Sequence, residues 1–135
     1  MIEERVAALI SEAITAGEIE GVATANVMTD AAGYTEWHEE PKIYVIRKST
    51  TTLPDMSGAE EYDTELVLSV MAVDKLSAQN LMAAVWPVIQ EGMQQVEGLS
   101  DWCPTELDAA PFFDGQVFRD QYYVIRKMRV IHTVF

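Results

Sequence analysis

The sequence has one cysteine, two histidines and nine basic residues among 135 positions. A single cysteine, Cys103, cannot form a disulfide within the chain, which excludes a disulfide-stapled fold. No apolar run reaches the roughly 18 residues that a membrane span requires. Met1–Arg5 contains acidic residues and starts no continuous apolar core, so it does not read as a secretory signal peptide. We therefore expect a protein that is made in the cytoplasm and used or assembled there.

Acidic residues outnumber basic ones by 22 to 9, which leaves a formal net charge of −13. Such a charge argues against a nucleic-acid-binding surface, because phosphate contacts require clustered lysine and arginine. The simplest interpretation is a solvated acidic surface. An apolar fraction of 49% is typical of globular chains, so we expect one domain with its own hydrophobic core.

Short polar clusters do not combine into a catalytic or metal site. Trp37–Glu40 places one histidine beside two carboxylates, but His132 is the only other histidine and a metal site needs more ligands. The acids of Glu60–Asp63 could form a catalytic pair, yet nothing indicates which pKa would be raised. Cys103 lies close to Asp101, and a neighbouring acid disfavours the thiolate. We expect no catalytic residue, no cofactor and no metal.

The stretch Glu61–Val96 predicts the centre of the fold. Glu61–Val73 is apolar and rich in β-branched residues, which is typical of a strand. An apolar stripe at helical spacing follows, and Asp74 or Ser77 can cap its first turn. Because the apolar pattern continues through Pro87, we expect one kinked helix. The predicted core contains Leu66, Leu68, Val70, Leu81, Val85 and Val88 beside Leu9 and Ile10, with Met71, Met82 and Met93 as filler.

Outside this stretch, the sequence predicts one further helix and several strands. Ile2–Ala16 has apolar residues at helical spacing, acidic residues in its first turn and Gly17 as a stop. Strands are predicted at Gly21–Thr29, Lys42–Ser49, Leu107–Phe113 and Gln121–Phe135, with irregular backbone at Leu99–Glu106 and a turn at Asp114–Gly115. This order predicts a single α+β domain over residues 1–135, with a mixed or antiparallel sheet of four to five strands and both helices packed on it.

Ser49–Asp63 is interpreted as a long polar connection between two strands. It is too long for a tight hairpin, and loops of this length are usually functional or mobile. We hypothesise that it is mobile alone and becomes ordered against a partner, with Leu53 and Met56 as apolar anchors. A merely tolerated surface loop is the alternative.

Most of the positive charge falls on two predicted strands. Its carriers are Lys42, Arg47, Lys48, Arg126, Lys127 and Arg129. Two interpretations are open: these side chains pair with nearby acids across the sheet, or they form a basic face that meets an acidic neighbour.

The order of elements and several segments resemble the tail terminator and tail-completion proteins of long-tailed bacteriophages. The similarity covers most of the chain. It rests on the N-terminal amphipathic helix, the Pro41–Ile46 strand after a proline, the long polar loop, the Tyr62–Val73 strand that runs into the Ala78–Trp86 helix, and the closing strand Tyr122–Val134.

The resemblance implies a structural virion protein without catalytic chemistry. Members of this family form a ring, commonly sixfold, that ends tube polymerisation and offers a surface to the head connector. The implied partners are further copies of the chain, the tail tube protein and head–tail connector proteins, while DNA passes through an acidic channel without specific binding. The candidate interface residues are Leu53, Asp55, Met56, Glu60, Glu61, Lys42, Arg47, Lys48, Arg126 and Arg129. The alternatives are another neck protein, or a small cytosolic enzyme or ligand-binding domain.

Overall fold

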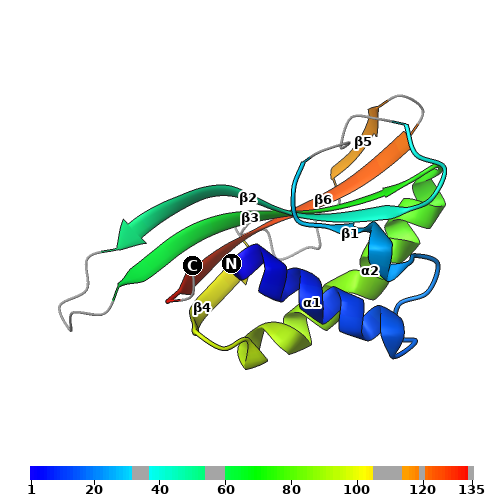
Figure 1. Cartoon of the computed structure of the whole chain (residues 1–135). Helices are drawn as coiled ribbons and strands as arrows, with labels where there is room; N and C mark the ends of the chain where they lie inside the picture. The colour runs from blue at the N-terminus through cyan, green and yellow to red at the C-terminus, as the bar shows by residue number, and fades with distance from the viewer. Residues whose placement is uncertain (32–36, 54–59, 105–113, 119–120, 134–135) are drawn as a thin grey trace.

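The computed structural model describes residues 1–31, 37–53, 60–104, 114–118 and 121–133. One mixed β-sheet forms the first layer, and two helices packed on the same face of the sheet form the second (Figure 1). This arrangement confirms the predicted α+β class. The elements are α1 (Ile2–Thr15), the 3-10 turn η1 (Thr24–Asn26), β1 (Val27–Met28), β2 (Lys42–Leu53), β3 (Glu61–Ala72), α2 (Lys75–Gly92), the 3-10 turn η2 (Met93–Gln95), β4 (Leu99–Pro104), β5 (Asp114–Phe118) and β6 (Gln121–His132).

The strands follow the order β1-β2-β3-β6-β4, and β5 also pairs with β6. β1 is parallel to β2, while the other pairings are antiparallel. β3 lies at the centre, with β2 along one side and β6 along the other for nearly its whole length. On the outer side of β6, β4 pairs with its second half and β5 with its first half.

The first helix agrees with its prediction to within one residue. α1 carries Glu3 and Glu4 in its first turn, where the helix dipole favours negative charge. Beyond its end, Gly17 adopts φ +80 and its N–H donates to the Ile14 carbonyl at 3.1 Å. This left-handed conformation suits glycine, because it has no Cβ to clash.

The second helix begins at the predicted cap. The Asp74 carboxylate accepts from the Ser77 N–H and from the Ser77 hydroxyl, both at 2.8 Å. These hydrogen bonds lower the pKa of Asp74. α2 continues through Pro87 as one helix, as predicted. Pro87 has no N–H, so the Ala83 carbonyl lacks its usual hydrogen bond within the helix. Both residues are exposed, so water can bind to that carbonyl.

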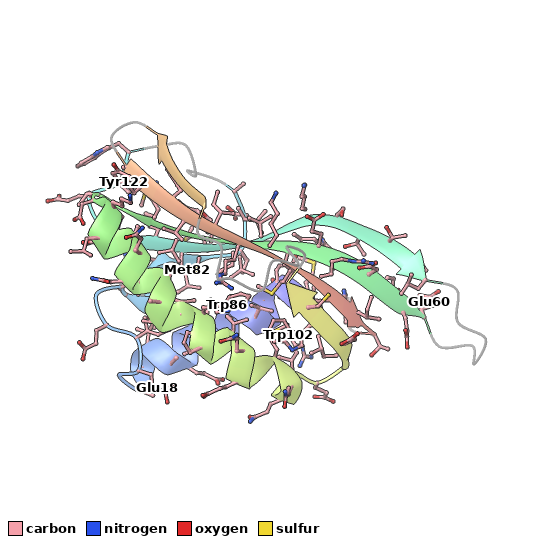
Figure 2. All side chains as sticks on the ribbon, turned by 180° about the vertical axis from the view of Figure 1, so that it is seen from behind. Glu18, Glu60, Met82, Trp86, Trp102 and Tyr122 are labelled. Atoms are coloured by element: carbon pink, nitrogen blue, oxygen red, sulfur yellow. The ribbon has the colours of Figure 1, made fainter. Side chains whose placement is uncertain are left out.

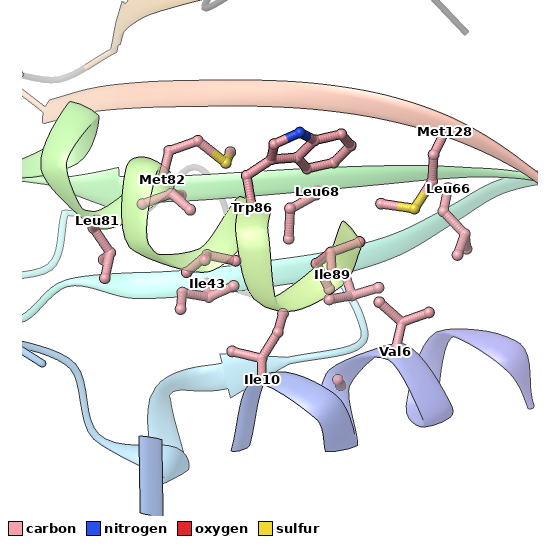
Figure 3. Close-up of a cluster of buried hydrophobic side chains, with 14 of the residues drawn as sticks. Val6, Ile10, Ile43, Leu66, Leu68, Leu81, Met82, Trp86, Ile89 and Met128 are labelled. Atoms are coloured by element: carbon pink, nitrogen blue, oxygen red, sulfur yellow. The ribbon is translucent and has the colours of Figure 1, made fainter. Parts of the chain in front are cut away.

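The core lies between the helices and the sheet (Figure 3). The predicted residues Leu66, Leu68, Val70, Val85 and Ile10 are fully buried, and Leu81 is nearly so. Val88 and Leu9 are half-buried at the margin of the same cluster. Met82 and Met93 are buried in the same cluster, as predicted, whereas Met71 is buried on the other face of the sheet. The main packing prediction is therefore confirmed.

Several segment predictions were wrong or only partly right. Gly21–Thr29 forms the turn η1 and the two-residue strand β1, because small residues and Asn26 suit a turn. Leu99–Glu106, predicted to be irregular, contains the strand β4, which is formed by pairing with β6. Asp114–Gly115 does not form a turn but begins β5. The predicted strand at Leu107–Phe113 lies outside the described residues.

The predicted long loop Ser49–Asp63 is largely strand. β2 continues to Leu53 and β3 begins at Glu61, with Leu53 opposite Glu61. The prediction was wrong here because Thr50–Thr52 lacks apolar alternation, although β-branched threonine favours strands. The remaining connection, residues 54–59, lies outside the described part of the chain, and with it the hypothesis that the loop is mobile.

Candidate assembly surface

The end of the β2–β3 pair forms a separate surface, here called the outer hairpin: Ser49–Leu53 of β2 and Glu61–Glu65 of β3. In Figure 1 the two strands run together past the N-terminal end of α1. Figure 2 shows Glu60 at the far tip of this pair. The outer hairpin therefore brings Leu53, Glu60 and Glu61, three predicted interface residues, to one end of the molecule.

A polar network on the helix-facing side joins the outer hairpin to β6. The Thr50 and Thr64 hydroxyl oxygens lie 3.1 Å apart, and the Thr64 oxygen lies 2.6 Å from Nε2 of His132. Thr64 and His132 are fully buried. The Tyr62 ring packs against the His132 ring with 5.7 Å between centroids. This network was not predicted, because nothing in the sequence places Thr50, Thr64 and His132 side by side.

Tyr62 extends the network to the tip of the hairpin. Its hydroxyl donates to the Glu60 carboxylate at 2.6 Å, and this hydrogen bond is the main cause of the raised pKa of Tyr62. The contact holds Glu60, which is exposed, beside the first residues of β3. The described tip of the hairpin therefore presents a carboxylate in a fixed place.

The helix-free side of the outer hairpin carries an acidic stripe. Glu61, Asp63 and Glu65 occupy alternate positions of β3, so their side chains share one face. Lys48 Nζ lies 3.7 Å from Glu65 Oε1. Arg129 on β6 binds the Asp63 carboxylate through two guanidinium nitrogens, which raises the pKa of Arg129. Glu61 has no ion-pair partner among the residues that the structure describes.

Arg47 and Lys42 of β2 are also held by contacts within the chain. Arg47 Nε lies 3.6 Å from Oε1 of Glu3, and Lys42 Nζ donates to Oδ1 of Asn26 at 3.0 Å. Of the two interpretations that the sequence leaves open, pairing with acids across the sheet describes Lys48 and Arg129, whereas Arg47 pairs with an acid of α1 and Lys42 binds an amide oxygen.

Arg126 differs because it lies on the helix-covered face. Its guanidinium carbon is 4.2 Å from the centre of the Trp86 ring, close enough for a cation–π contact. Trp86 in turn meets Trp102 of β4 edge to face, with 6.2 Å between centroids. Arg126 therefore connects β6 to α2 and does not join the predicted exposed basic face. Asp55 and Met56, also predicted at the interface, lie outside the described residues.

Exposed apolar side chains gather at the opposite end of the sheet. Val73, directly after β3, is 45% exposed, and Leu76, in the first turn of α2, is 67% exposed. Trp37 is 57% exposed. It precedes His38, whose backbone carbonyl accepts a hydrogen bond from the side chain of Gln121 at the start of β6. Since Ala72 pairs with Tyr122, all of these residues lie at this end. The two ends of β3, twelve residues and roughly 40 Å apart, thus differ in chemistry.

The other polar clusters and grooves of the described structure give weaker evidence of a functional site than the two ends of the sheet. Within the described ranges, no group of three His, Cys, Asp or Glu side chains is placed to hold a metal ion. Cys103 is exposed on β4. A groove of about 600 Å³ between α1 and η2 is lined by Met1, Glu4, Leu9, Val96 and their neighbours. No helix in the part of the chain that the structure covers is long and apolar enough to span a membrane.

No protein-family model matches this chain, and no curated protein matches its sequence. Functional inference therefore comes from the arrangement of its elements and from the surface that they present.

Proposed function

We propose that this chain is a structural component of a long-tailed bacteriophage virion, a tail terminator. In this role, copies of the chain form a ring, commonly of six subunits, at the head-proximal end of the tail tube. The ring ends tube polymerisation and presents a joining surface to the head connector. The proposal begins from the resemblance in element order: a helix, two long strands, a helix that follows the second strand at once, and a long closing strand.

The observation that carries the proposal is the difference between the two ends of β3. The outer hairpin presents the acids Glu60 and Glu61, whereas the opposite end exposes the apolar side chains Val73 and Leu76. A ring that joins two different structures needs two chemically distinct surfaces on every subunit.

A ring requires a heterologous contact, in which two different patches of the same chain meet. The basic strands were one half of the contact expected from the sequence. Because Arg47, Lys48 and Arg129 already bind Glu3, Glu65 and Asp63 of the same chain, a contact built only on these cations is disfavoured. The outer hairpin instead provides one patch through the side chains of Leu53, Glu60 and Glu61.

The net charge of −13 fits a channel through which DNA passes without being held. Phosphates bind to clustered cations, and two of the cations on β2 and β6, Lys48 and Arg129, are offset by neighbouring carboxylates. Weak interaction with DNA is what a passage for the genome requires.

Electron microscopy of the purified protein, alone and mixed with tail tube protein, tests the proposal. We expect rings that bind to tube ends and tubes that stop growing when the protein is added. A variant in which Glu60 and Glu61 are both replaced by lysine should fold, because neither side chain is buried, and fail to cap tubes, while Glu91→Lys on the exposed side of α2 should cap normally.

A protein that stays monomeric at high concentration and leaves tube ends free would refute the proposal. Binding to connector proteins but not to tubes would assign the chain to another position in the neck. Turnover or tight binding of a small molecule, with no tube contact, would favour the enzyme or ligand-binding alternative.

A further inference from the structure

The two outer strands β4 and β2 differ in what they offer to another strand. In β4, the Trp102 N–H donates to Oδ1 of Asp101 at 2.8 Å, so this donor is already occupied. Pro104, also in β4, has no N–H at all. Proteins commonly protect sheet edges with such features, because a free edge can pair with another chain. β4 is therefore closed to strand addition over its second half.

β2 is protected only along its first part. β1 pairs with Ile43 and Tyr44, and the register shift between Arg47 and Ser49, together with Lys48, interrupts the edge beyond them. Both a bulge and an edge lysine disfavour further pairing. These features end before Ser49.

Ser49–Leu53 forms a regular edge with one free side. Each of its residues lies opposite one residue of β3, and no described strand pairs with its other side. In an antiparallel pair, every second residue points its N–H and C=O away from the partner strand. Ser49, Thr51 and Thr52 are exposed. This run therefore presents a row of backbone donors and acceptors that fits one more strand.

The charge beside this edge indicates what kind of strand fits. Ser49, Thr51 and Leu53 lie opposite Glu65, Asp63 and Glu61, on the helix-free face. A strand added to β2 would lie about 10 Å from β3, twice the usual strand spacing. Because Ser49 and Thr51 are short, a long basic side chain on the added strand can reach across them to Glu65 and Asp63, and Glu61 lies two residues beyond Asp63 on the same face.

Cations of the chain offset this stripe only in part. Lys48 and Arg129 are placed against Glu65 and Asp63, but Glu61 has no such partner in the described structure, and the exposed Glu60 adds a further negative charge. The surroundings of the free edge are therefore net negative.

We propose that the Ser49–Leu53 edge binds an extended segment of another polypeptide that carries lysine or arginine at alternate positions. The segment adds to β2 as a further strand of the sheet. Main-chain hydrogen bonds supply affinity, and the acidic stripe selects basic side chains on the helix-free face. This inference concerns the chemistry of the binding edge, and it holds whether or not the chain caps a tail tube.

An NMR titration of the ¹⁵N-labelled full chain tests the proposal. The probe is a blocked seven-residue peptide in which lysine alternates with valine. We expect shifts concentrated on the amides of Lys48–Leu53, slower hydrogen exchange there, and binding that weakens as salt is raised. Two comparison peptides replace every lysine with glutamate, or the central valine with proline. Both should bind much more weakly.

Two variants with the same change in net charge show whether peptide binding depends on the charge beside the edge or on the charge of the whole protein. Glu61→Lys and Glu91→Lys change the net charge equally, but Glu91 lies on the exposed side of α2. We expect Glu61→Lys to weaken peptide binding roughly two- to fivefold, the effect of one or two exposed charge contacts. Glu91→Lys should leave binding nearly unchanged.

Four results would overturn the proposal. These are the absence of shifts at millimolar peptide, shifts centred on other elements, equal binding of the glutamate peptide, and equal weakening by the two variants. Shifts of Ser49–Leu53 that depend on protein concentration without any peptide would assign the edge to a second copy of the chain. Failure of tube capping with normal peptide binding would reject the proposed function and leave this inference standing.

Discussion

Replacing Val85 by aspartate is the sharpest test of the core. Val85 lies on α2, is fully buried and belongs to the main apolar cluster. Losing its buried side chain costs about 1.5 kcal/mol, and a carboxyl group without a partner costs about 1–3 kcal/mol more. Keeping that group protonated at pH 7.5, about 3.5 units above its ordinary pKa, adds about 5 kcal/mol. The total, about 7.5–9.5 kcal/mol, is comparable to the whole stability of a typical domain, about 5–15 kcal/mol.

This estimate includes a specific pH dependence. Burial raises the pKa of the new carboxyl in the folded state, so folding binds a proton and the variant gains stability as pH falls. Between pH 7.5 and pH 5.5 the destabilisation of Val85→Asp should shrink by about 2.7 kcal/mol. Val85→Asn has a similar shape and no titrating group, so its destabilisation should stay constant relative to the parent chain.

Urea unfolding followed by tryptophan fluorescence measures both variants against the parent at each pH. The range stops at pH 5.5 because the sequence pI is about 4.3 and solubility falls near it. If Val85→Asp unfolds at the same urea concentration as the parent, the position of Val85 in the core is wrong. If Val85→Asp and Val85→Asn respond alike to pH, the buried charge is not the cause of the instability.

Three further predictions concern individual contacts. Asp74→Ala should lower the melting temperature by a few degrees, because it removes the cap of α2. Since hydrogen bonds lower the pKa of Asp74, the parent should lose the stability that this cap contributes as pH falls through that lowered pKa. Melting curves of both proteins across the acidic range measure the two effects. Thr64→Val should destabilise by about 1–3 kcal/mol, because it removes a buried partner of His132, and a double-mutant cycle with His132→Phe should show coupling between the two sites. Gly92→Ala places a Cβ 3.0 Å from two methyl carbons of Leu9, so Leu9 must shift to admit it; the substitution should therefore stabilise a Leu9→Ala background more than the parent, by up to about 1 kcal/mol, as measured by urea unfolding.

Helices and strands whose own residues show a clear apolar pattern could be predicted from the sequence. α1 and α2 each have an apolar stripe at helical spacing and recognisable end residues, so their existence and most of their bounds agree with prediction. β3 and β6 are rich in β-branched and apolar residues and were found for the same reason.

Elements that depend on distant pairing could not be predicted in this way. β4 contains aspartate and proline, which are uncommon in strands, and it is a strand because β6 lies beside it. The outer part of β2 is polar, so it reads as a loop until β3 is placed opposite it.

The same limit applies to the candidate surface. Its acids and cations are visible in the sequence, but their partners are not. Arg47 meets Glu3 and Arg126 meets Trp86 only because α1 and α2 pack on the same face of the sheet. Which cations remain available to a partner is therefore a property of the tertiary fold.

The position of β6 has a consequence for the order in which the fold can form. β4 and β5 precede β6 in the chain, yet each pairs with β6, along different halves of it. During synthesis, α1, the β2–β3 pair and α2 can come together early, because their contacts lie within residues that have already been made. β4 and β5 must wait without a partner until β6 emerges, since no described strand other than β6 pairs with either. The side of β3 that β6 covers is open for the same interval. Completion of the sheet is thus a late and concerted event, and a pause before β6 is translated is the moment at which the nascent chain is most exposed to aggregation.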